Sequence, residues 1–190
     1  MVGNMGSGNK VQIMKNYSIL NPMPSLLRRY IRSVVSESAE PRRYWGRGGA
    51  GIVFICPERN TILLGKRSSW VMDPGTWGSP GGAVDGGMHT TPIEDPITDE
   101  SIFRDTALRE TEEECGSLPM GLTLSGRTEF EDEGFRYVTY LARLSPQQVD
   151  RWKLNSPDGE TDEWKWFPFD DLPSPVHPKL ASSLRRLRVT

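Results

Sequence analysis

The stretch Arg109-Glu110-Thr111-Glu112-Glu113-Glu114-Cys115-Gly116 places four glutamates within five positions. Like charges on adjacent turns of a helix repel each other, so this density requires either solvent or a cation. On a helix, Glu110, Glu113 and Glu114 are related as i, i+3 and i+4, and their carboxylates share one face. Such ligands suit Mg²⁺, which completes its octahedral shell with water and phosphate oxygens. The stretch therefore indicates either a metal site against a phosphorylated ligand or a solvated acidic face.

A glycine-containing segment, Pro80-Gly81-Gly82-Ala83-Val84-Asp85, ends a strand-like stretch upstream of these glutamates. In this order the two segments resemble the Nudix hydrolase superfamily, whose box reads G-x5-E-x7-R-E-U-x-E-E-x-G-U, with U an aliphatic residue. The matching positions are Gly82, Arg109-Glu110, Glu113-Glu114 and Gly116. The half of the box from Arg109 to Gly116 is matched closely, and that half is specific. The resemblance covers roughly residues 46–187.

The box departs from the family pattern in both composition and length. Counting back from Arg109, Ser101 stands where the family has its first glutamate, and Ser117 stands where it has an aliphatic residue. The chain is also longer than the pattern by the thirteen residues Met88 to Glu100. Two prolines and a polar majority predict a loop for this insert, which lengthens the turn without moving the helix. Glu100 either replaces the missing carboxylate or is an ordinary first-turn acid.

The resemblance implies a site built from the matched positions. It implies that Glu110, Glu113 and Glu114 are metal ligands, together with the backbone carbonyl of Gly81, where glycine lets the chain approach the ion closely. It implies that Arg109 orients the carboxylates, which an i, i+4 pair with Glu113 would also do. The expected cofactor is Mg²⁺, with Mn²⁺ as a substitute.

A general base is also implied by the resemblance. Glu113 is our first choice, because it belongs to the box. The family often draws an acid instead from a loop such as Ser156-Pro-Asp-Gly-Glu-Thr-Asp-Glu163, where Glu160 and Glu163 are candidates. The alternative for these two residues is a solvated acidic loop.

The expected chemistry follows from what a diphosphate linkage requires. Water must attack a phosphorus surrounded by negative oxygens, so catalysis needs cations that neutralise this charge. We therefore expect a Mg²⁺-dependent pyrophosphohydrolase that cleaves the diphosphate linkage of a nucleoside diphosphate joined to another moiety. Substrates of nucleotide, nucleotide sugar, ADP-ribose or dinucleotide type are expected.

Two alternatives remain open at this point. Leu63 to Ser68, followed by Pro80 to Asp85, partly resembles the coenzyme A pyrophosphatase branch, although the spacing is one residue short and Ser79 replaces a phenylalanine. Pro74 to Gly78 looks more like general nucleotide and nucleotide sugar hydrolases. The second alternative is a Nudix-fold nucleotide-binding module without turnover, which Ser101 and the insert would explain.

Several basic and aromatic residues are candidates for substrate binding. Arg47 begins a predicted strand, and Lys66 and Arg67 end another, so their charges could face phosphates. Trp77, like Trp70 and Phe135, could stack on a base. Each of these aromatic side chains could equally belong to the core or the rim.

The chain has 190 residues and a net charge of −2, which fits one domain of ordinary size with an extension. Residues 1–44 form the basic extension, in which 25–35 has the apolar spacing of a short amphipathic helix. Residues 45–190 form the Nudix-type domain. We expect the helix to pack on the domain or on a second subunit of a homodimer. A basic amphipathic helix can also bind nucleic acid or a membrane surface. The aromatic residues of a single-strand binder are few, so no nucleic-acid partner is expected.

No segment has the apolar length needed to cross a bilayer, so no membrane association is expected. The first ten residues lack the basic-then-apolar order of a secretion signal, which predicts a cytoplasmic protein. Cys56 and Cys115 give neither a disulfide framework nor a metal-site spacing and are expected to be reduced packing residues. The expected partner is a small-molecule nucleotide.

The apolar and turn patterns predict strands alternating with helices, which fits an α/β/α sandwich on a mixed sheet. A hairpin is predicted from 47–56 and 61–67. The side of the glutamate helix that carries Leu108, Thr111 and Cys115 is assigned to the core, and Asp99 or Thr98 is expected to cap its start. Further strands are predicted over 122–130, 135–144 and 164–168, and further helices over 146–152 and 178–187.

Overall fold

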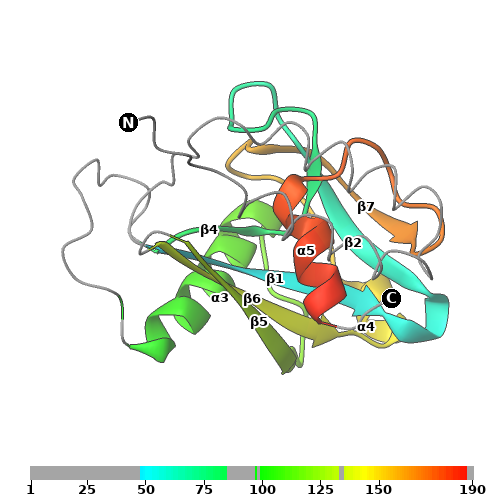
Figure 1. The fold of residues 1–190 in the computed structure, drawn as a ribbon. Coiled ribbons are helices and arrows are strands. Elements are labelled where there is room, and N and C mark those ends of the chain that lie inside the picture. The colour runs from blue at the N-terminus through cyan, green and yellow to red at the C-terminus, as the bar shows by residue number, and fades with distance from the viewer. Residues whose placement is uncertain (1–47, 85–96, 98, 133–134, 188–190) are drawn as a thin grey trace, which may run out of the picture. The chain divides into compact units, whose positions relative to one another are not determined.

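The computed structural model describes residues 48–84, 97, 99–132 and 135–187. The predicted extension over 1–44 with its helix, Arg47, Thr98 and most of the insert lie outside these residues. The elements in chain order are β1 (Gly48–Cys56), the 3-10 helix η2 (Pro57–Arg59), β2 (Thr61–Arg67), β3 (Trp77–Gly78), β4 (Gly81–Ala83), α3 (Glu100–Cys115), β5 (Leu124–Asp132), β6 (Phe135–Arg143), α4 (Pro146–Arg151), β7 (Thr161–Pro168) and α5 (Pro178–Arg186) (Figure 1).

Within the described residues, the strands form one mixed sheet of seven members. Its order is β3-β2-β1-β6-β5, with β4 paired to β1 and β7 paired to β2. β1 runs parallel to β6 and antiparallel to β2 and β4. Because strands border β1 on both edges and both of its faces are covered, all of its residues are buried. Its apolar run is therefore continuous instead of alternating with polar residues.

The hairpin of β1 and β2 confirms the sequence prediction. Ile55 pairs with Ile62, and Cys56 pairs with Thr61. Pro57 begins η2, and Asn60 ends the turn with a φ of 52°. This is the left-handed region, which asparagine tolerates better than most residues with a side chain. The turn chemistry of four residues therefore sets the register of the two strands.

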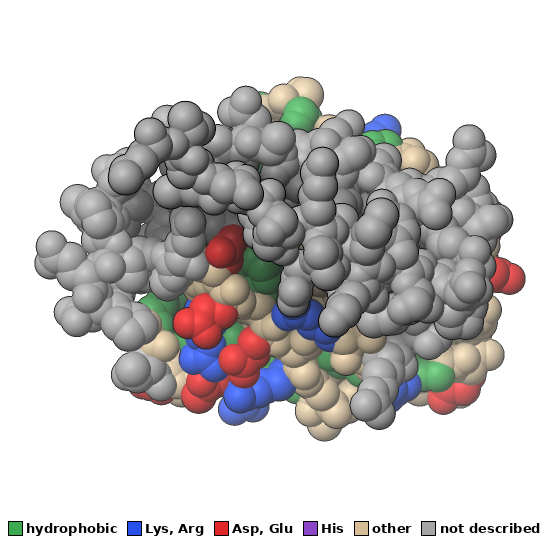
Figure 2. All heavy atoms as spheres, in the orientation of Figure 1, with side chains coloured by type: hydrophobic (Ala, Val, Ile, Leu, Met, Phe, Trp, Pro, Cys, Tyr) green, Lys and Arg blue, Asp and Glu red, His purple; other side chains and the backbone are tan. Residues whose placement is uncertain are grey.

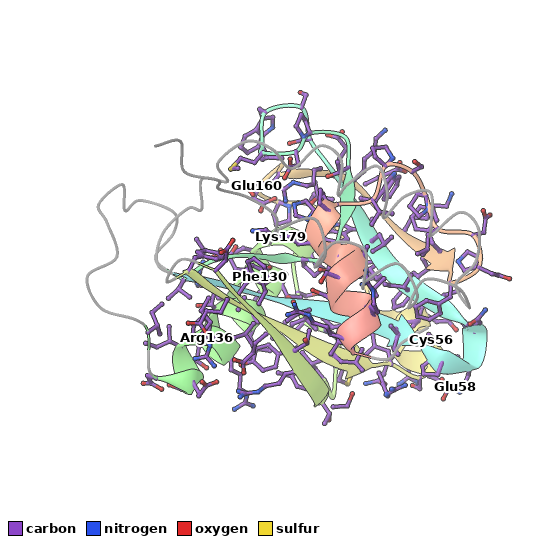
Figure 3. The ribbon with its side chains drawn as sticks, viewed as in Figure 1. Cys56, Glu58, Phe130, Arg136, Glu160 and Lys179 are labelled. Atoms are coloured by element: carbon purple, nitrogen blue, oxygen red, sulfur yellow. The ribbon has the colours of Figure 1, made fainter. Side chains whose placement is uncertain are left out.

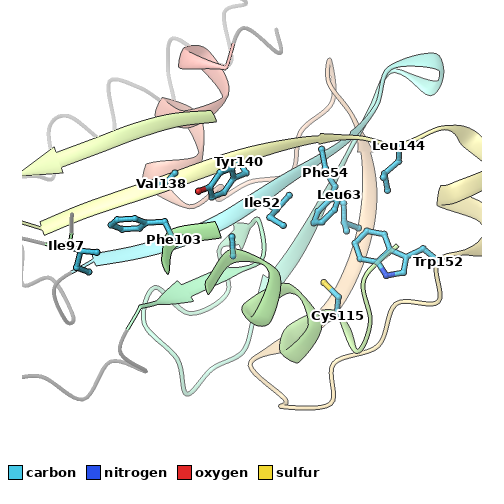
Figure 4. Close-up of a cluster of buried hydrophobic side chains, with 13 residues drawn as sticks. Ile52, Phe54, Leu63, Ile97, Phe103, Cys115, Val138, Tyr140, Leu144 and Trp152 are labelled. Carbon is cyan, nitrogen blue, oxygen red and sulfur yellow. The ribbon is translucent and has the colours of Figure 1, made fainter. Parts of the chain in front are cut away.

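Helices cover both faces of the sheet. Each strand can contribute to both contacts, because its side chains alternate between the faces. On one face, Phe54 of β1 and Val138 of β6 join Phe103 of α3 in the main core cluster (Figure 4). On the other face, the hydroxyl oxygens of Thr139 on β6 and Ser183 on α5 lie 3.2 Å apart. The predicted α/β/α sandwich on a mixed sheet is thus confirmed (Figure 1).

The glutamate helix α3 begins and ends where its capping residues require. The Asp99 carboxylate accepts a hydrogen bond from the backbone nitrogen of Ser101 at 2.9 Å, which satisfies a free donor of the first turn. Gly116 follows the last turn with a φ of 77°, as is common for glycine after a helix. Thr111 and Cys115 are fully buried, which confirms the side of the helix assigned to the core.

The remaining predicted elements are present with shifted ends. β5 begins and ends two residues later than predicted, and β6, α4 and α5 each end one residue earlier. β7 begins at Thr161 instead of Trp164, because Thr161 pairs with Arg67 beyond a bulge in β2. Both cysteines are buried and free. No helix in the described part of the chain is long and apolar enough to span a bilayer.

Candidate metal and substrate site

Glu114 and Glu110, on the last two turns of α3, lie against the glycine strand β4. The Oε1 atom of Glu114 accepts a hydrogen bond from the backbone nitrogen of Gly81 at 3.1 Å. A Cβ atom on Gly82 would overlap the Glu110 carboxylate. Gly82 is therefore a steric requirement for the position of Glu110, whereas a Cβ atom on Gly81 would overlap Gly51 and Ala50 of β1.

Arg109 links two of the glutamates. Its guanidinium lies 2.6 Å from Oε1 of Glu110 and 2.8 Å from Oε2 of Glu113, and it donates a hydrogen bond to the carbonyl of Ala83 at 3.3 Å. The Glu113 side chain is 51% exposed, whereas that of Glu110 is 14% exposed. The three glutamates predicted to share one helix face thus differ in environment. Glu110 and Glu114 face β4, and Glu113 turns toward solvent and Arg109.

Burial changes the ionisation of the two inner carboxyl groups. It raises the pKa of Glu114 to about 8, which the nearby charge of Glu110 reinforces and the hydrogen bond from Gly81 opposes. Burial also raises the pKa of Glu110, which the charge of Arg109 opposes. The positive charge of Arg109 therefore only partly compensates for the removal of Glu110 from water, and Glu114 forms no ion pair among the described residues. A divalent cation supplies such charge.

The donor set fits a hard divalent ion in its chemistry. The matched positions offer carboxylate oxygens and the backbone carbonyl of Gly81, which are the ligand types of Mg²⁺ and Mn²⁺. Among the residues that the structure describes, however, no three His, Cys, Asp or Glu side chains form a group that could hold a metal ion. Glu113 instead pairs with Arg109 and is the more exposed partner of that ion pair.

The acidic loop before β7 contributes charge to the site. The negative charge of Glu160 raises the pKa of Glu110, and that of Asp158 raises the pKa of Glu114. The backbone carbonyl of Glu160 accepts a hydrogen bond from the nitrogen of Ser68 at 2.9 Å, which ties the loop to the end of β2 (Figure 3). Asp158 was not singled out from the sequence, where the several acids of this loop could not be told apart.

Glu163 lies on β7 itself and faces away from the glutamate helix. It is exposed and stands opposite Lys66 in the strand register. Its neighbour Trp164 packs on the α3 side of the sheet and donates a hydrogen bond from Nε1 to the carbonyl of Glu114 at 3.2 Å. Since neighbouring residues of a strand face opposite sides, the structure brings Glu160 to the site and leaves Glu163 on the other face.

The residues predicted to bind substrate have different positions in the structure. Trp77 is buried and packs edge-on against Phe167, with ring centroids 4.8 Å apart, which is the core position that the sequence left open. Lys66 pairs with Trp77 and Glu163 in the sheet. Arg67 lines a pocket, and its Nε donates a hydrogen bond to the carbonyl of Met72 at 2.6 Å.

This pocket has a volume of about 210 Å³ and lies between β4, β6 and α5. Gly81 and Gly82 border it at the end nearest the glutamates. The opposite wall includes His177, whose Nε2 lies 3.1 Å from Oδ2 of Asp73, and Lys179, whose Nζ lies 5.1 Å from the ring centroid of Phe135 (Figure 3). The pocket thus combines polar, charged and aromatic side chains beside the carboxylates.

A separate ion-pair network occupies the start of α3. Glu100 lies 2.5 Å from both Arg127 and Arg136, and Glu129 pairs with the same two arginines. Figure 2 shows acidic and basic side chains intermingled on one face of the molecule. Ser101 donates a hydrogen bond from its hydroxyl to Asp99 at 2.8 Å. Glu100 and Ser101 are therefore engaged at the helix start and not beside Glu110.

Comparison with known proteins agrees with this architecture. The model of the NUDIX domain family matches residues 46–187. The chain therefore belongs to the NUDIX family and is a Nudix hydrolase by class.

Two curated relatives share about a third of the aligned sequence. A Mycobacterium tuberculosis protein named "Putative 8-oxo-dGTP diphosphatase 3" is 32% identical over 166 residues, which cover 82% of this chain and 67% of that protein. A "Nucleoside triphosphate pyrophosphatase/Nudix hydrolase fusion protein" of Bifidobacterium longum is 31% identical over 139 residues, which cover 70% of this chain and 26% of that protein.

Solved structures show the same fold. RenU, a Nudix hydrolase of Mycobacterium smegmatis, superposes with a TM-score of 0.55 at 28% identity, over 80% of this chain and 89% of that chain. A MutT NUDIX hydrolase of Burkholderia pseudomallei gives a TM-score of 0.52 at 25% identity, over 76% of this chain and 99% of that chain.

Proposed function

We propose that the chain is a Mg²⁺-dependent pyrophosphohydrolase that cleaves the diphosphate linkage of a nucleoside diphosphate joined to another moiety. One observation carries this proposal: Glu110 and Glu114 are both held against the glycine strand β4 with raised pKa values. Two carboxylates removed from water at one point favour a divalent cation there. Mn²⁺ has the same preference for oxygen ligands and is expected to substitute for Mg²⁺.

Each residue of the site has a proposed role. Glu110, Glu114 and the carbonyl of Gly81 would hold the ion, and Glu113 would join them if its exposed side chain turned away from Arg109. When bound, the ion would supply charge neutralisation for the phosphates and a more acidic water. Arg109 positions Glu110 through its ion pair and its contact with β4. Gly82 leaves the space that the Glu110 carboxylate needs.

The base that removes a proton from the attacking water comes from one of two places. Glu113 is the most exposed of the three box glutamates, so it can reach a water at the mouth of the site. Glu160 is the alternative, because its loop lies near enough for its charge to act on Glu110. Glu163 is not proposed, since it lies on the opposite face of the sheet.

The substrate class rests on the pocket and on the relatives. The name of the Mycobacterium tuberculosis relative points to a modified deoxynucleoside triphosphate. The mixed polar and aromatic lining of the pocket suits a nucleoside, whose base has a flat apolar face and a polar edge. Arg67 supplies a positive charge for the phosphates. We therefore place nucleoside triphosphates first among the nucleotide, nucleotide sugar, ADP-ribose and dinucleotide types, and coenzyme A after them.

A panel assay tests this function. Purified protein would be incubated with dGTP, 8-oxo-dGTP, ADP-ribose, a dinucleoside tetraphosphate and coenzyme A, each with Mg²⁺, with Mn²⁺ and with excess chelator. We expect release of a nucleoside monophosphate or phosphoadenosine product from at least one compound only when a divalent ion is present. Binding of a nucleotide without turnover of any panel member would instead support the non-hydrolytic module, which Ser101 motivates.

We also propose that the protein acts in the cytoplasm on small nucleotides, and that residues 1–44 serve association into a homodimer and not catalysis. A deletion of residues 1–40 would keep full activity and lower the mass measured by light scattering from that of a dimer to that of a monomer. Loss of activity with unchanged mass would contradict this assignment.

A further inference from the structure

Two glycines of β1, Gly49 and Gly51, leave space for one aromatic side chain. A Cβ atom on Gly49 would lie 2.7 Å from Cδ2 of Tyr137, and one on Gly51 would lie 2.8 Å from the Tyr137 hydroxyl oxygen. β1 and β6 are parallel neighbours, with Gly49 opposite Tyr137. The Tyr137 ring therefore lies flat across β1, in space that any larger residue at these positions would fill.

The Tyr137 hydroxyl ends beside the proposed metal ligand. Gly51 pairs with Gly81 of β4, and a Cβ atom on Gly81 would lie 2.7 Å from the hydroxyl oxygen. Tyr137, Gly81 and Gly82 line the same pocket. A tyrosine hydroxyl, whose usual pKa is about 10, keeps its proton at neutral pH and can donate a hydrogen bond.

This hydroxyl has no hydrogen-bond partner among the residues that the structure describes. The Tyr137 side chain is partly buried and borders the pocket, so water or a ligand in the pocket can accept a hydrogen bond from its hydroxyl. Nearby polar side chains of the pocket already have hydrogen-bond partners, since Thr139 pairs with Ser183 and Asp73 pairs with His177. The donor of Tyr137 is thus directed at whatever occupies the pocket beside Gly81.

We propose that the Tyr137 hydroxyl binds the substrate, donating a hydrogen bond to a non-bridging phosphate oxygen held next to Gly81. This inference rests on the proposed function, which puts the diphosphate at the carboxylate end of the pocket. Phosphate oxygens only accept hydrogen bonds, and a phenol that keeps its proton can donate one. The bond goes to the phosphate and not to the base, because the hydroxyl lies at the glycine strand beside the carboxylates.

The substitution Tyr137→Phe removes the donor and keeps the ring packed against Gly49 and Gly51. We expect kcat/KM to fall about 10- to 100-fold, as for loss of one hydrogen bond to a charged group. The factor should be equal for dGTP and 8-oxo-dGTP, since the base is not involved. The Mg²⁺ concentration for half-maximal activity and the Tm should stay unchanged, because phenylalanine keeps the packed ring and the hydroxyl is not a proposed metal ligand.

Tyr140→Phe is the matched control, because Tyr140 lies on the same strand but on the opposite face, in the core cluster under α3. It should leave kcat/KM unchanged. An active wild-type enzyme with an equally active Tyr137→Phe variant would overturn this inference alone. So would a loss explained by weaker Mg²⁺ dependence or by a lower Tm, since the residue would then act on the metal site or the fold. A wild-type protein inactive on the whole panel would overturn the proposed function and this inference with it.

Discussion

The backbone nitrogen of Gly81 donates a hydrogen bond to Oε1 of Glu114 at 3.1 Å, which joins the strand before the insert to the helix after it. The two residues are 33 positions apart. The insert between them therefore does not decide their distance, because β4 is held by β1 and α3 by the core. A loop can grow at such a place at small entropic cost, provided its two ends stay fixed.

Substitution of Glu110 or Glu114 should strongly slow hydrolysis. Glu110→Gln and Glu114→Gln would each lower kcat by about 10³-fold, because charge stabilisation by a metal ion is worth several kcal/mol. Steady-state kinetics over a range of Mg²⁺ concentrations would measure this loss. Glu112→Gln is the control, since Glu112 is exposed and does not share the helix face of Glu110 and Glu114. Undiminished activity in both inner variants would refute the ligand assignment.

Gly82→Ala should damage the site more than the fold. The added Cβ would overlap the Glu110 carboxylate, and a displacement of about 1 Å at a catalytic group can lower the rate about 10²-fold. Kinetics and thermal unfolding of the same preparation would separate the two effects. Gly126→Ala serves as the control, because its Cβ would come no closer than 3.7 Å to a neighbour. Equal activity of the two variants would mean that Glu110 does not need this space.

Glu160→Gln and Glu163→Gln should differ in their kinetics. If Glu160 is the base, its substitution lowers kcat about 10²-fold or more, as expected for loss of general base catalysis. Glu163→Gln should behave as wild type, because Glu163 is on the other face of the sheet. Glu113→Gln completes the comparison: a large loss there with an active Glu160→Gln variant would assign the base to Glu113. A large loss in Glu163→Gln alone would contradict the placement of Glu163 on the other face of β7.

The network at the start of α3 should contribute to stability and not to activity. Glu100→Gln would lower the free energy of unfolding at neutral pH by about 0.5 kcal/mol, since exposed ion pairs contribute little. The hydrogen bond from Arg136 lowers the pKa of Glu100 below its usual value of 4.5. Its contribution is therefore present above pH 4.5 and is lost as the pH falls through the lower pKa of the folded state.

Urea unfolding of wild type and Glu100→Gln at about pH 7 and about pH 3 would measure this difference. The two proteins should converge at the lower pH, and also at high salt, which screens exposed charges. Hydrolysis should be the same in both. A clear loss of activity in Glu100→Gln would show that Glu100 replaces the box carboxylate that Ser101 lacks.

Local patterns were sufficient for most of the secondary structure. The hairpin of β1 and β2, the cap at Asp99, the end of α3 at Gly116 and the buried side of that helix follow from residues close in the sequence. Their physical causes, turn conformation, satisfaction of free backbone groups and helical period, act over a few positions. The boundary of β7 was predicted incorrectly, since it depends on pairing with β2.

The sequence by itself determined the family, the α/β/α class and the identity of the box glutamates, because these rest on residue types at fixed spacing. Tertiary structure alone decided which of those glutamates are buried, which acid of the loop lies near them, that Trp77 belongs to the core and that Tyr137 reaches Gly81. Each of these depends on strands and helices from distant parts of the chain. Burial and electrostatic coupling arise only when such segments pack, so no local pattern encodes them.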